Sequence, residues 1–284
     1  MTEVGLLSYN LRRDNRADGV NRWRHRRDRV AATVRGADIA GLQEARWPML
    51  RDLVYGAPMH RWVGVGRSDG HKQGEFVPVL WRADRYVAVE HGHFWLSSHP
   101  DVPGSRDHER AVVRMATWVR LTERGTDRRL FVLNTHLDHR VEQARVEGAH
   151  QIRRALDDLV GDEAVVVTGD LNATPADEAY AVLTAPDGHR VSLVDAQAVA
   201  ERHEGPTTTL NGFDAPRPGK RIDVVLLSPG WAVTTYRVDD RAESGRYPSD
   251  HFPVEVVATD PGDNLPPSVV HATIGGRFSD ASSP

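Results

Sequence analysis

The sequence of 284 residues contains no cysteine and no long apolar run. Without cysteine, the chain has no disulfide framework, no thiolate zinc site and no cysteine nucleophile. No stretch approaches the roughly 20 consecutive apolar residues of a membrane span. Residues 1–10 lack the basic and apolar segments of a secretory signal and lead directly into a strand-like run. We therefore expect a cytoplasmic, monomeric protein without membrane insertion.

The chain also lacks a large excess of one sign of charge, since its formal net charge is -4. A protein that neutralises several nucleic-acid phosphates usually presents a basic face, so this balance argues against a processive or duplex-binding nuclease. The local charge is different, because residues 12–35 contain nine arginines. We interpret this run as a solvated helix face, and a phosphate-facing patch is the less favoured alternative.

Hydrophobic patterning predicts an α/β protein in which short β-branched runs alternate with helical segments. The predicted strands cover residues 4–9, 38–42, 62–65, 76–81, 86–89, 111–121, 130–133, 165–167, 222–227, 233–238 and 252–257, and the predicted helices cover residues 20–34, 141–159 and 177–183. No convincing linker interrupts residues 1–260, which favours one domain. Residues 261–284 are rich in Pro, Gly and Ser and are expected to form a tail.

One internal repeat is visible, because the order strand, helix, strand occurs twice. Asn10 and Glu44 end the two strands of the first half, and Asn134 and Asp170 end those of the second. Asn134 follows Asn10 by 124 positions, and Asp170 follows Glu44 by 126. If each half supplies one sheet, polar residues at four strand ends converge on one edge of a layered core.

Asp170 and Asn172 stand where the buried run of residues 164–167 opens towards solvent. Gly169 lets the backbone turn there without a Cβ atom. A carboxylate that takes a proton and an amide that orients an oxygen suit an anionic or metal-bound substrate. An Asx-rich turn is the alternative that this segment alone leaves open.

Further polar side chains lie at the ends of other predicted strands, and these are His136, Asp223, Asp250 and His251. Glu75 lies at the start of the predicted strand 76–81. Carboxylate and amide oxygens suit Mg²⁺ or Mn²⁺. Zinc is less favoured, because strand alternation would send His136 and His139 to opposite faces. The pair His91 and His93 has no nearby third ligand.

Six segments resemble, in family order, the endonuclease/exonuclease/phosphatase superfamily, which includes deoxyribonuclease I and inositol polyphosphate 5-phosphatases. They are residues 8–10, 42–44, 134–137, 169–172, 221–223 and 249–251, and the resemblance spans residues 4–258. Residues 134–140 and 247–253 look like a bacterial branch described as metal-dependent hydrolases. The resemblance implies a four-layer α/β sandwich, with two mixed β-sheets packed face to face and helices on the outside.

The resemblance also implies how the metal and the attacking water are held. Glu44 would be the main ligand of Mg²⁺ or Mn²⁺, with Asn10 beside it and Asp250 close enough to help. Asp170 would orient and deprotonate the water, and Asn172 would hold that water or a phosphate oxygen.

Two histidines would face the scissile phosphate in the same family pattern. Asp223 would keep His251 in the right tautomer, and Glu75 would brace His136. Arg110 and Asn134 are the candidate substrate-binding residues, Arg110 because a guanidinium fork matches phosphate oxygens.

These features predict an Mg/Mn-dependent phosphodiesterase or phosphatase that cleaves a small or terminal phosphoester by in-line attack of water. The enzyme alternative is a nuclease acting on DNA or RNA, with the arginine run and residues 106–114 as its track. A catalytically silent binding scaffold ranks behind both, because no metal, water-activating or histidine position is missing. Hydrolysis of a glycosidic bond by Asp170 and Glu44 is possible in principle, but nothing in the sequence favours it.

Overall fold

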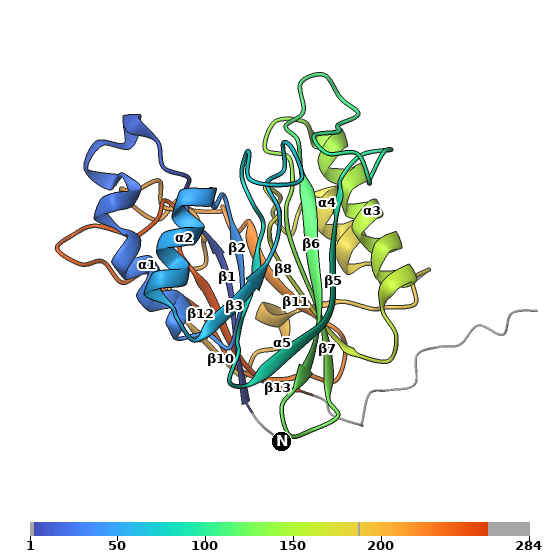
Figure 1. The fold of residues 1–284 in the computed structure, drawn as a ribbon. Helices are drawn as coiled ribbons and strands as arrows, with labels where there is room; N and C mark the ends of the chain where they lie inside the picture. The colour runs from blue at the N-terminus through green and yellow to red at the C-terminus, as the bar shows by residue number, and fades with distance from the viewer. Residues whose placement is uncertain (1–2, 187, 261–284) are drawn as a thin grey trace, which may run out of the picture.

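Two mixed β-sheets lie face to face in the computed structural model, which describes residues 3–186 and 188–260. Helices cover the outer faces of both sheets (Figure 1). The four-layer α/β sandwich that the sequence predicted is therefore confirmed. The tail predicted for residues 261–284 lies outside the described residues.

The first sheet has seven strands, which are β1 (Glu3–Asn10), β2 (Ile39–Gln43), β3 (His60–Val63), β4 (Val79–Arg82), β10 (Arg202–Glu204), β12 (Ala232–Val238) and β13 (Val254–Thr259). Their spatial order is β10-β12-β13-β1-β2-β4-β3. The central strand β1 pairs in parallel with β2 and antiparallel with β13. The outer face is covered by α1 (Arg27–Arg35) and α2 (Trp47–Gly56) (Figure 1).

The second sheet has six strands, which are β5 (Tyr86–Trp95), β6 (Met115–Glu123), β7 (Arg129–His136), β8 (Ala164–Asp170), β9 (Val194–Asp195) and β11 (Asp223–Leu227). Their spatial order is β5-β6-β7-β8-β11-β9. The outer face is covered by α3 (Glu142–Leu159) and α4 (Glu178–Thr184) (Figure 1). The short helix α5 (Ala196–Val199) follows β9 directly.

Strand alternation explains why four layers form. Successive side chains of a strand point to opposite faces, so a strand that is apolar throughout is covered on both sides. On β1, Leu6 packs in the cluster between the sheets with Val132, whereas Leu7 packs in the cluster beneath α1 with Val34. The core therefore consists of a central layer between the sheets and one layer beneath each pair of helices.

The internal repeat is present in the strands that end at the predicted site. β1 and β2 are parallel neighbours, and so are β7 and β8. The prediction that each strand–helix–strand unit supplies one sheet is confirmed, since β1 and β2 lie in the first sheet and β7 and β8 lie in the second. The later strands β12 and β13 return to the first sheet. β13 pairs antiparallel with β1, with Val254 opposite Ser8, so the segment that precedes β13 lies next to the strand end that carries Asn10.

Two predicted strands begin later than expected. β4 begins at Val79, since Phe76 makes only an isolated bridge with Ala45. β6 begins at Met115, because the preceding segment is irregular. There the Val112 N–H donates a hydrogen bond to the Asp138 carboxylate at a distance of 2.5 Å. Conversely, β5 runs on to Trp95, beyond the predicted end at residue 89.

The helix predicted for residues 20–34 is correct only in its second half. Two 3-10 turns, Arg16–Asn21 and Trp23–His25, precede α1, and Gly19 has a φ of 54° that interrupts helical geometry. Helix α2 was not predicted from the sequence, although Pro48 in its first turn is typical of a helix start. None of the helices in residues 3–186 and 188–260 is long and apolar enough to cross a membrane.

Candidate active site

Three site residues share one row across the second sheet. Asp170 ends β8 and is paired in register with His136 on β7 and with Asp223 on β11. Side chains paired across neighbouring strands lie on the same face. All three are nearly or fully buried, on the face that looks towards the first sheet. The register therefore places two carboxylates and an imidazole beside one another at the end of the sheet.

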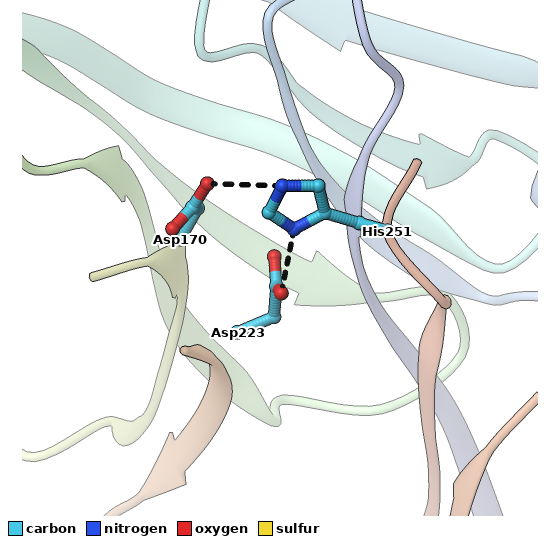
Figure 2. A group of neighbouring side chains, drawn as sticks. All are labelled: Asp170, Asp223 and His251. Atoms are coloured by element: carbon cyan, nitrogen blue, oxygen red, sulfur yellow. Dashed lines mark hydrogen bonds and ion pairs between the residues drawn. The ribbon is translucent and has the colours of Figure 1, made fainter. Parts of the chain in front are cut away.

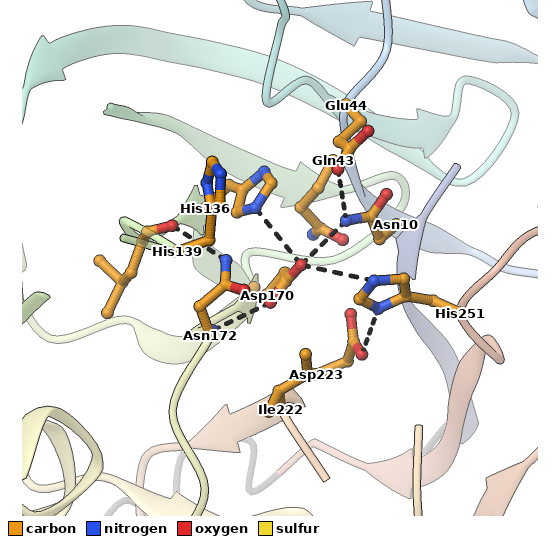
Figure 3. A network of polar contacts seen from close by, with 12 residues as sticks. Asn10, Gln43, Glu44, His136, His139, Asp170, Asn172, Ile222, Asp223 and His251 are labelled. Carbon is orange, nitrogen blue, oxygen red and sulfur yellow. Dashed lines mark hydrogen bonds and ion pairs between the residues drawn. The ribbon is translucent and has the colours of Figure 1, made fainter. Parts of the chain in front are cut away.

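Asp170 is the centre of this network (Figure 3). Its Oδ2 accepts a hydrogen bond from Asn10 Nδ2 at 2.9 Å and lies 3.3 Å from His136 Nε2. Its Oδ1 accepts from the Asn172 N–H at 2.9 Å. Burial and the neighbouring Asp223 raise the pKa of Asp170 to about 7, against the opposing effect of His251. Asp170 therefore exchanges its proton near neutral pH, as a general base requires.

His251 bridges the two carboxylates of the row (Figure 2). Its Nδ1 lies 2.8 Å from Asp223 Oδ2, and its Nε2 lies 3.9 Å from Asp170 Oδ2. Burial alone would lower the pKa of His251, but Asp223, Asp170 and Asp250 raise it well above the ordinary value. The imidazole is therefore held as a cation by Asp223, with its other nitrogen directed at Asp170.

His136 has the opposite electrostatic setting. Burial lowers the pKa of His136 well below its ordinary value, and Arg114 and Arg67 lower it further. Its Nδ1 has no hydrogen-bond partner among the described residues. The surroundings therefore favour the neutral form of His136 and the cationic form of His251.

The loop after β1 holds the acidic residues of the first sheet. The Arg13 N–H donates to Glu44 Oε2 at 3.0 Å, and Asn10 Nδ2 lies 3.4 Å from Glu44 Oε1. Arg12 lies 3.5 Å from the Asp250 carboxylate. Burial raises the pKa of Asp250, and the neighbouring Glu44 raises it further. Glu44 and Asp250 are thus two half-buried carboxylates close to Asn10, whose Nδ2 faces Glu44 and whose Oδ1 accepts from the Arg12 N–H. Carboxylate and amide oxygens are the donors that a hard divalent cation prefers.

A second group also has the spacing of a metal site. Within the described part of the chain, ligand atoms of Asp170, Asp223 and His251 all lie within 4.8 Å of one another. A protonated imidazole has no lone pair to give to a metal, and the His251 Nδ1 already bonds to Asp223. The donor chemistry therefore favours the group of Glu44, Asn10 and Asp250 over this one.

Two residues of the site have left-handed backbone conformations. Glu44 has a φ of 60°, and Asn172 has a φ of 47°. Asparagine tolerates this region, whereas for glutamate it is strained. Asn172 also directs its amide Nδ2 to the Leu137 carbonyl at 3.1 Å. At Asn172 the conformation agrees with local preference, whereas at Glu44 tertiary contacts such as the bond from the Arg13 N–H must hold it.

Glu75 does not contact His136 as the sequence analysis expected. Its two oxygens lie 2.9 Å from Arg13, 2.6 Å from Arg67 and 3.7 Å from Arg114. Glu75, Arg67, Arg114 and His136 nevertheless line the same small pocket. Glu75 therefore contacts Arg67 and Arg114, which lie beside His136, and makes no direct contact with His136 itself.

Two candidate substrate contacts are placed elsewhere by the structure. Arg110 is exposed on the loop before β6, whereas Arg114, one residue before the strand, reaches the pocket. Asn134 is fully buried between the sheets, where its Nδ2 donates to the Leu42 and Pro78 carbonyls. Its Oδ1 accepts from Gln43 Nε2 at 2.7 Å. Asn134 therefore joins the two sheets and is not available to a substrate.

Arg67 and Arg114, which line the pocket with His136, were not predicted as individual site residues, although Arg114 lies in the segment 106–114 of the nuclease alternative. For Arg114, the signal was present but misread, because the predicted strand began at residue 111 and Arg110 therefore stood at its mouth. Arg67 lies in the loop after β3, where the sequence gives no periodic pattern that would fix its direction. Only the folded chain brings it to Glu75.

The chain is similar in sequence and structure to proteins of one family. The sequence model of the Endonuclease/Exonuclease/phosphatase family matches residues 7–251. A solved endonuclease/exonuclease/phosphatase from Bacteroides vulgatus is 32% identical, with a TM-score of 0.86, over 92% of this chain and 100% of that chain. A mannosyl-6-phosphatase from Bacteroides thetaiotaomicron is 30% identical, with a TM-score of 0.83, over 90% of this chain and 99% of its own.

A more distant structure shares the fold alone. TDP2 from D. rerio, solved with a single-strand DNA product, is 17% identical with a TM-score of 0.68, over 91% of this chain and 100% of that one. No match was found among the curated proteins.

Proposed function

Because the chain belongs to the endonuclease/exonuclease/phosphatase family, we propose that it is a metal-dependent hydrolase of small or terminal phosphoesters. One observation carries the proposal. A carboxylate with a pKa of about 7, Asp170, lies between a cationic and a neutral histidine at the joined ends of the two sheets. This arrangement suits activation of a water molecule beside a phosphate.

Asp170 is the general base in this mechanism. At neutral pH a substantial fraction of the carboxylate is ionised, so it can accept a proton from a water molecule that attacks phosphorus in line with the leaving oxygen. Asn10 donates to Oδ2 and the Asn172 N–H donates to Oδ1, and these bonds fix the direction of the carboxylate. A lone pair that these bonds leave free would accept the proton of the attacking water.

The two histidines would interact with the phosphate in different ways. Cationic His251, held by Asp223 at 2.8 Å, stabilises the charge that builds up on the phosphate oxygens. Neutral His136 donates or accepts a hydrogen bond without adding charge beside Asp170. Because they differ in charge, the two imidazoles can contact the same phosphate in different ways.

Enzymes of this family typically use divalent metals, and Glu44, Asn10 and Asp250 would hold the ion here. Oxygen donors of this kind suit Mg²⁺ or Mn²⁺. When bound, the ion would neutralise phosphate charge and stabilise the leaving oxygen. Arg13 and Arg12, which contact Glu44 and Asp250, orient these carboxylates.

The first test is the hydrolysis of p-nitrophenyl phosphate and bis-p-nitrophenyl phosphate in EDTA and after addition of Mg²⁺, Mn²⁺ or Zn²⁺. We expect activity only with metal, highest with Mg²⁺ or Mn²⁺. Asp170→Ala should reduce turnover at least ~100-fold, as loss of a general base usually does. Full activity in EDTA, or a normal rate for Asp170→Ala, would refute the mechanism.

A nuclease remains the second candidate, since the family includes enzymes of that kind. The basic surface expected to bind nucleic-acid phosphates has fewer free charges in the folded protein. Arg26 of the arginine run is buried, and Arg22 is paired with Asp14 at 2.7 Å. Cleavage of duplex DNA that falls steeply with salt, together with no hydrolysis of either nitrophenyl ester, would favour the nuclease.

A further inference from the structure

Thr209 lies in the loop between β10 and β11 and is fully buried. Its Oγ1 accepts hydrogen bonds from the backbone N–H groups of Ile222 and Asp223, at 3.0 and 3.1 Å. The same hydroxyl lies 3.3 Å from the Lys220 carbonyl, to which it donates. One threonine side chain therefore binds the start of β11, the strand whose first residue is Asp223.

The start of β11 lies beyond the reach of the neighbouring strand. β9 pairs with β11 at Leu226 and Leu227, further along the strand than Asp223. Without the Thr209 hydroxyl, the N–H groups of Ile222 and Asp223 would lose their acceptor in a buried position. A buried N–H group without an acceptor costs about as much as a lost hydrogen bond, so this part of the backbone would have to move.

The backbone of Thr209 holds a second segment of the site. The Phe252 N–H donates to the Thr209 carbonyl at 2.7 Å. The next residue, Leu210, forms an antiparallel bridge with His251. Thr209 therefore connects the segment that carries His251 to the strand that begins with Asp223.

The direction of the Asp223 carboxylate depends on this backbone. Its Oδ2 lies 2.8 Å from His251 Nδ1 (Figure 2), and its Oδ1 has no hydrogen-bond partner among the described residues. The Asp170 carboxylate, in contrast, accepts hydrogen bonds from Asn10 and Asn172. A shift of the Asp223 backbone would therefore pass directly to the bond with His251.

We infer that Thr209 is a positioning residue that fixes the geometry of the Asp223–His251 pair. Its hydroxyl holds the backbone of Asp223, and its carbonyl holds the segment of His251. The inference rests on the proposed function for its effect on catalysis, but the placement of the pair can be measured without turnover.

The kinetic test uses Thr209→Val, which removes the hydroxyl and keeps the branched shape of the side chain. With Mg²⁺ and p-nitrophenyl phosphate we expect kcat to fall about 10-fold or more, because small displacements of catalytic groups have large effects. KM should change less than about 3-fold, since the interaction that is weakened acts in the transition state. Thr209→Ser keeps the hydroxyl and should retain most of the activity.

Thr208→Val is the matched control. Thr208 is 3% exposed, and its Oγ1 donates to the Arg217 and Lys220 carbonyls at 2.5 and 2.9 Å. The substitution thus removes a similarly buried hydroxyl from the same loop, but it leaves the bonds to Ile222 and Asp223 in place. We expect kcat and KM of this variant to equal those of the wild type.

A second measurement needs no substrate. Proton NMR in EDTA should show a low-field resonance for the His251 Nδ1–H that bonds to Asp223, and its absence in His251→Gln assigns it. The resonance should persist in Thr208→Val and Thr209→Ser, and it should shift or disappear in Thr209→Val. The Asp223 amide should also exchange with deuterium at least ~10-fold faster in Thr209→Val, because it has lost its acceptor.

The two measurements separate this inference from the proposed function. A wild type that hydrolyses no phosphoester, with the resonance changed in Thr209→Val, would refute the proposed function and retain the positioning role. In an active enzyme, a normal kcat or an unchanged resonance in Thr209→Val, or equal losses in Thr208→Val, would overturn the inference. If Thr209→Val does not fold, Thr209→Ala removes the same oxygen and is judged by the same outcomes.

Discussion

The ionised form of Asp170, which the proposed mechanism requires, lowers the free energy of unfolding because the side chain is buried. Its pKa is raised to about 7 by burial and by Asp223, compared with an ordinary value of 3.8. Between these two pH values the folded state binds more protons at this site than the unfolded state does. Its contribution to stability therefore decreases as pH rises through this window. In the proposed mechanism catalysis needs the ionised form of Asp170, and this ionisation opposes folding.

Asp170→Asn removes this cost together with the base. In EDTA at pH 8 we expect the melting temperature of this variant to exceed that of the wild type by at least about 3 °C. At pH 5, where the wild-type carboxyl is already protonated in the folded state, the difference should be much smaller. Thermal unfolding across this pH range measures it. A constant difference, or a variant less stable at pH 8, would contradict the assigned pKa.

Glu44, the proposed metal ligand, has a strained backbone conformation just after β2. With a φ of 60°, the residue occupies a region that glycine adopts without strain. Glu44→Gly should therefore be more stable than Glu44→Ala by about 1 kcal/mol, although both variants lose activity. At the exposed helical residue Glu142 the order should reverse, since alanine favours a helix. Urea unfolding of the four variants tests this, and equal stability at position 44 would argue against strain.

At the scale of elements, Arg26 connects two loops that supply the site. Its guanidinium donates to the carbonyls of Leu11 and Arg12, which follow β1, and to the Pro248 carbonyl at 3.2 Å, which precedes Asp250. The side chain is 1% exposed, and its Cζ lies 5.3 Å from the centre of the Trp23 ring. Arg26 thus holds the Asn10 and Asp250 segments in fixed relation.

Arg26→Met should both destabilise the protein and weaken metal binding. We expect a loss of roughly 2–4 kcal/mol in unfolding free energy, because several buried carbonyls lose their donor. Mn²⁺ affinity, measured by calorimetry at a temperature where the variant is folded, should fall about 10-fold. The exposed neighbour offers the control Arg24→Met, which should change neither quantity. Normal Mn²⁺ affinity in folded Arg26→Met would restrict Arg26 to a structural role.

The elements that carry the site could be predicted to different extents from the sequence. Strand ends such as Asp170 follow apolar runs that alternation and turn residues identify well, so the network around Asp170 could be anticipated. Arg26 could not, because a run of arginines predicts a solvated face and only tertiary contacts bury one member. Arg114 was missed because a side chain–backbone bond to Asp138 delays the start of β6 by four residues.

At the scale of the whole molecule, the site depends on how closely the two sheets approach. Asp170 belongs to the second sheet, whereas Asn10, which bonds to it at 2.9 Å, belongs to the first. The sheets approach closely at Gly41 of β2. A Cβ atom there would clash with Thr168 Oγ1 and lie 2.8 Å from the Asn134 side chain.

Gly41→Ala should therefore force the sheets apart. We expect a loss of about 1–3 kcal/mol in unfolding free energy, as is typical of overpacking. Gly5→Ala on β1 is the control, since its Cβ would find only ordinary contacts at 3.6 Å. Combining Gly41→Ala with Thr168→Ala should recover part of the loss, because residues in contact are not additive. Chemical denaturation of the single and double variants measures these differences.

The same substitution tests whether sheet spacing controls catalysis. Gly41 lies outside the network around Asp170, yet a shift of β2 and β1 would move Glu44 and Asn10 away from Asp170. Small misplacements of catalytic groups have large kinetic effects, so we expect Gly41→Ala to lower kcat by about 10-fold or more at temperatures where it is folded. Recovery of both stability and kcat by Thr168→Ala would link the two effects. Normal kcat in Gly41→Ala would mean that the strand ends keep their spacing independently of the sheets.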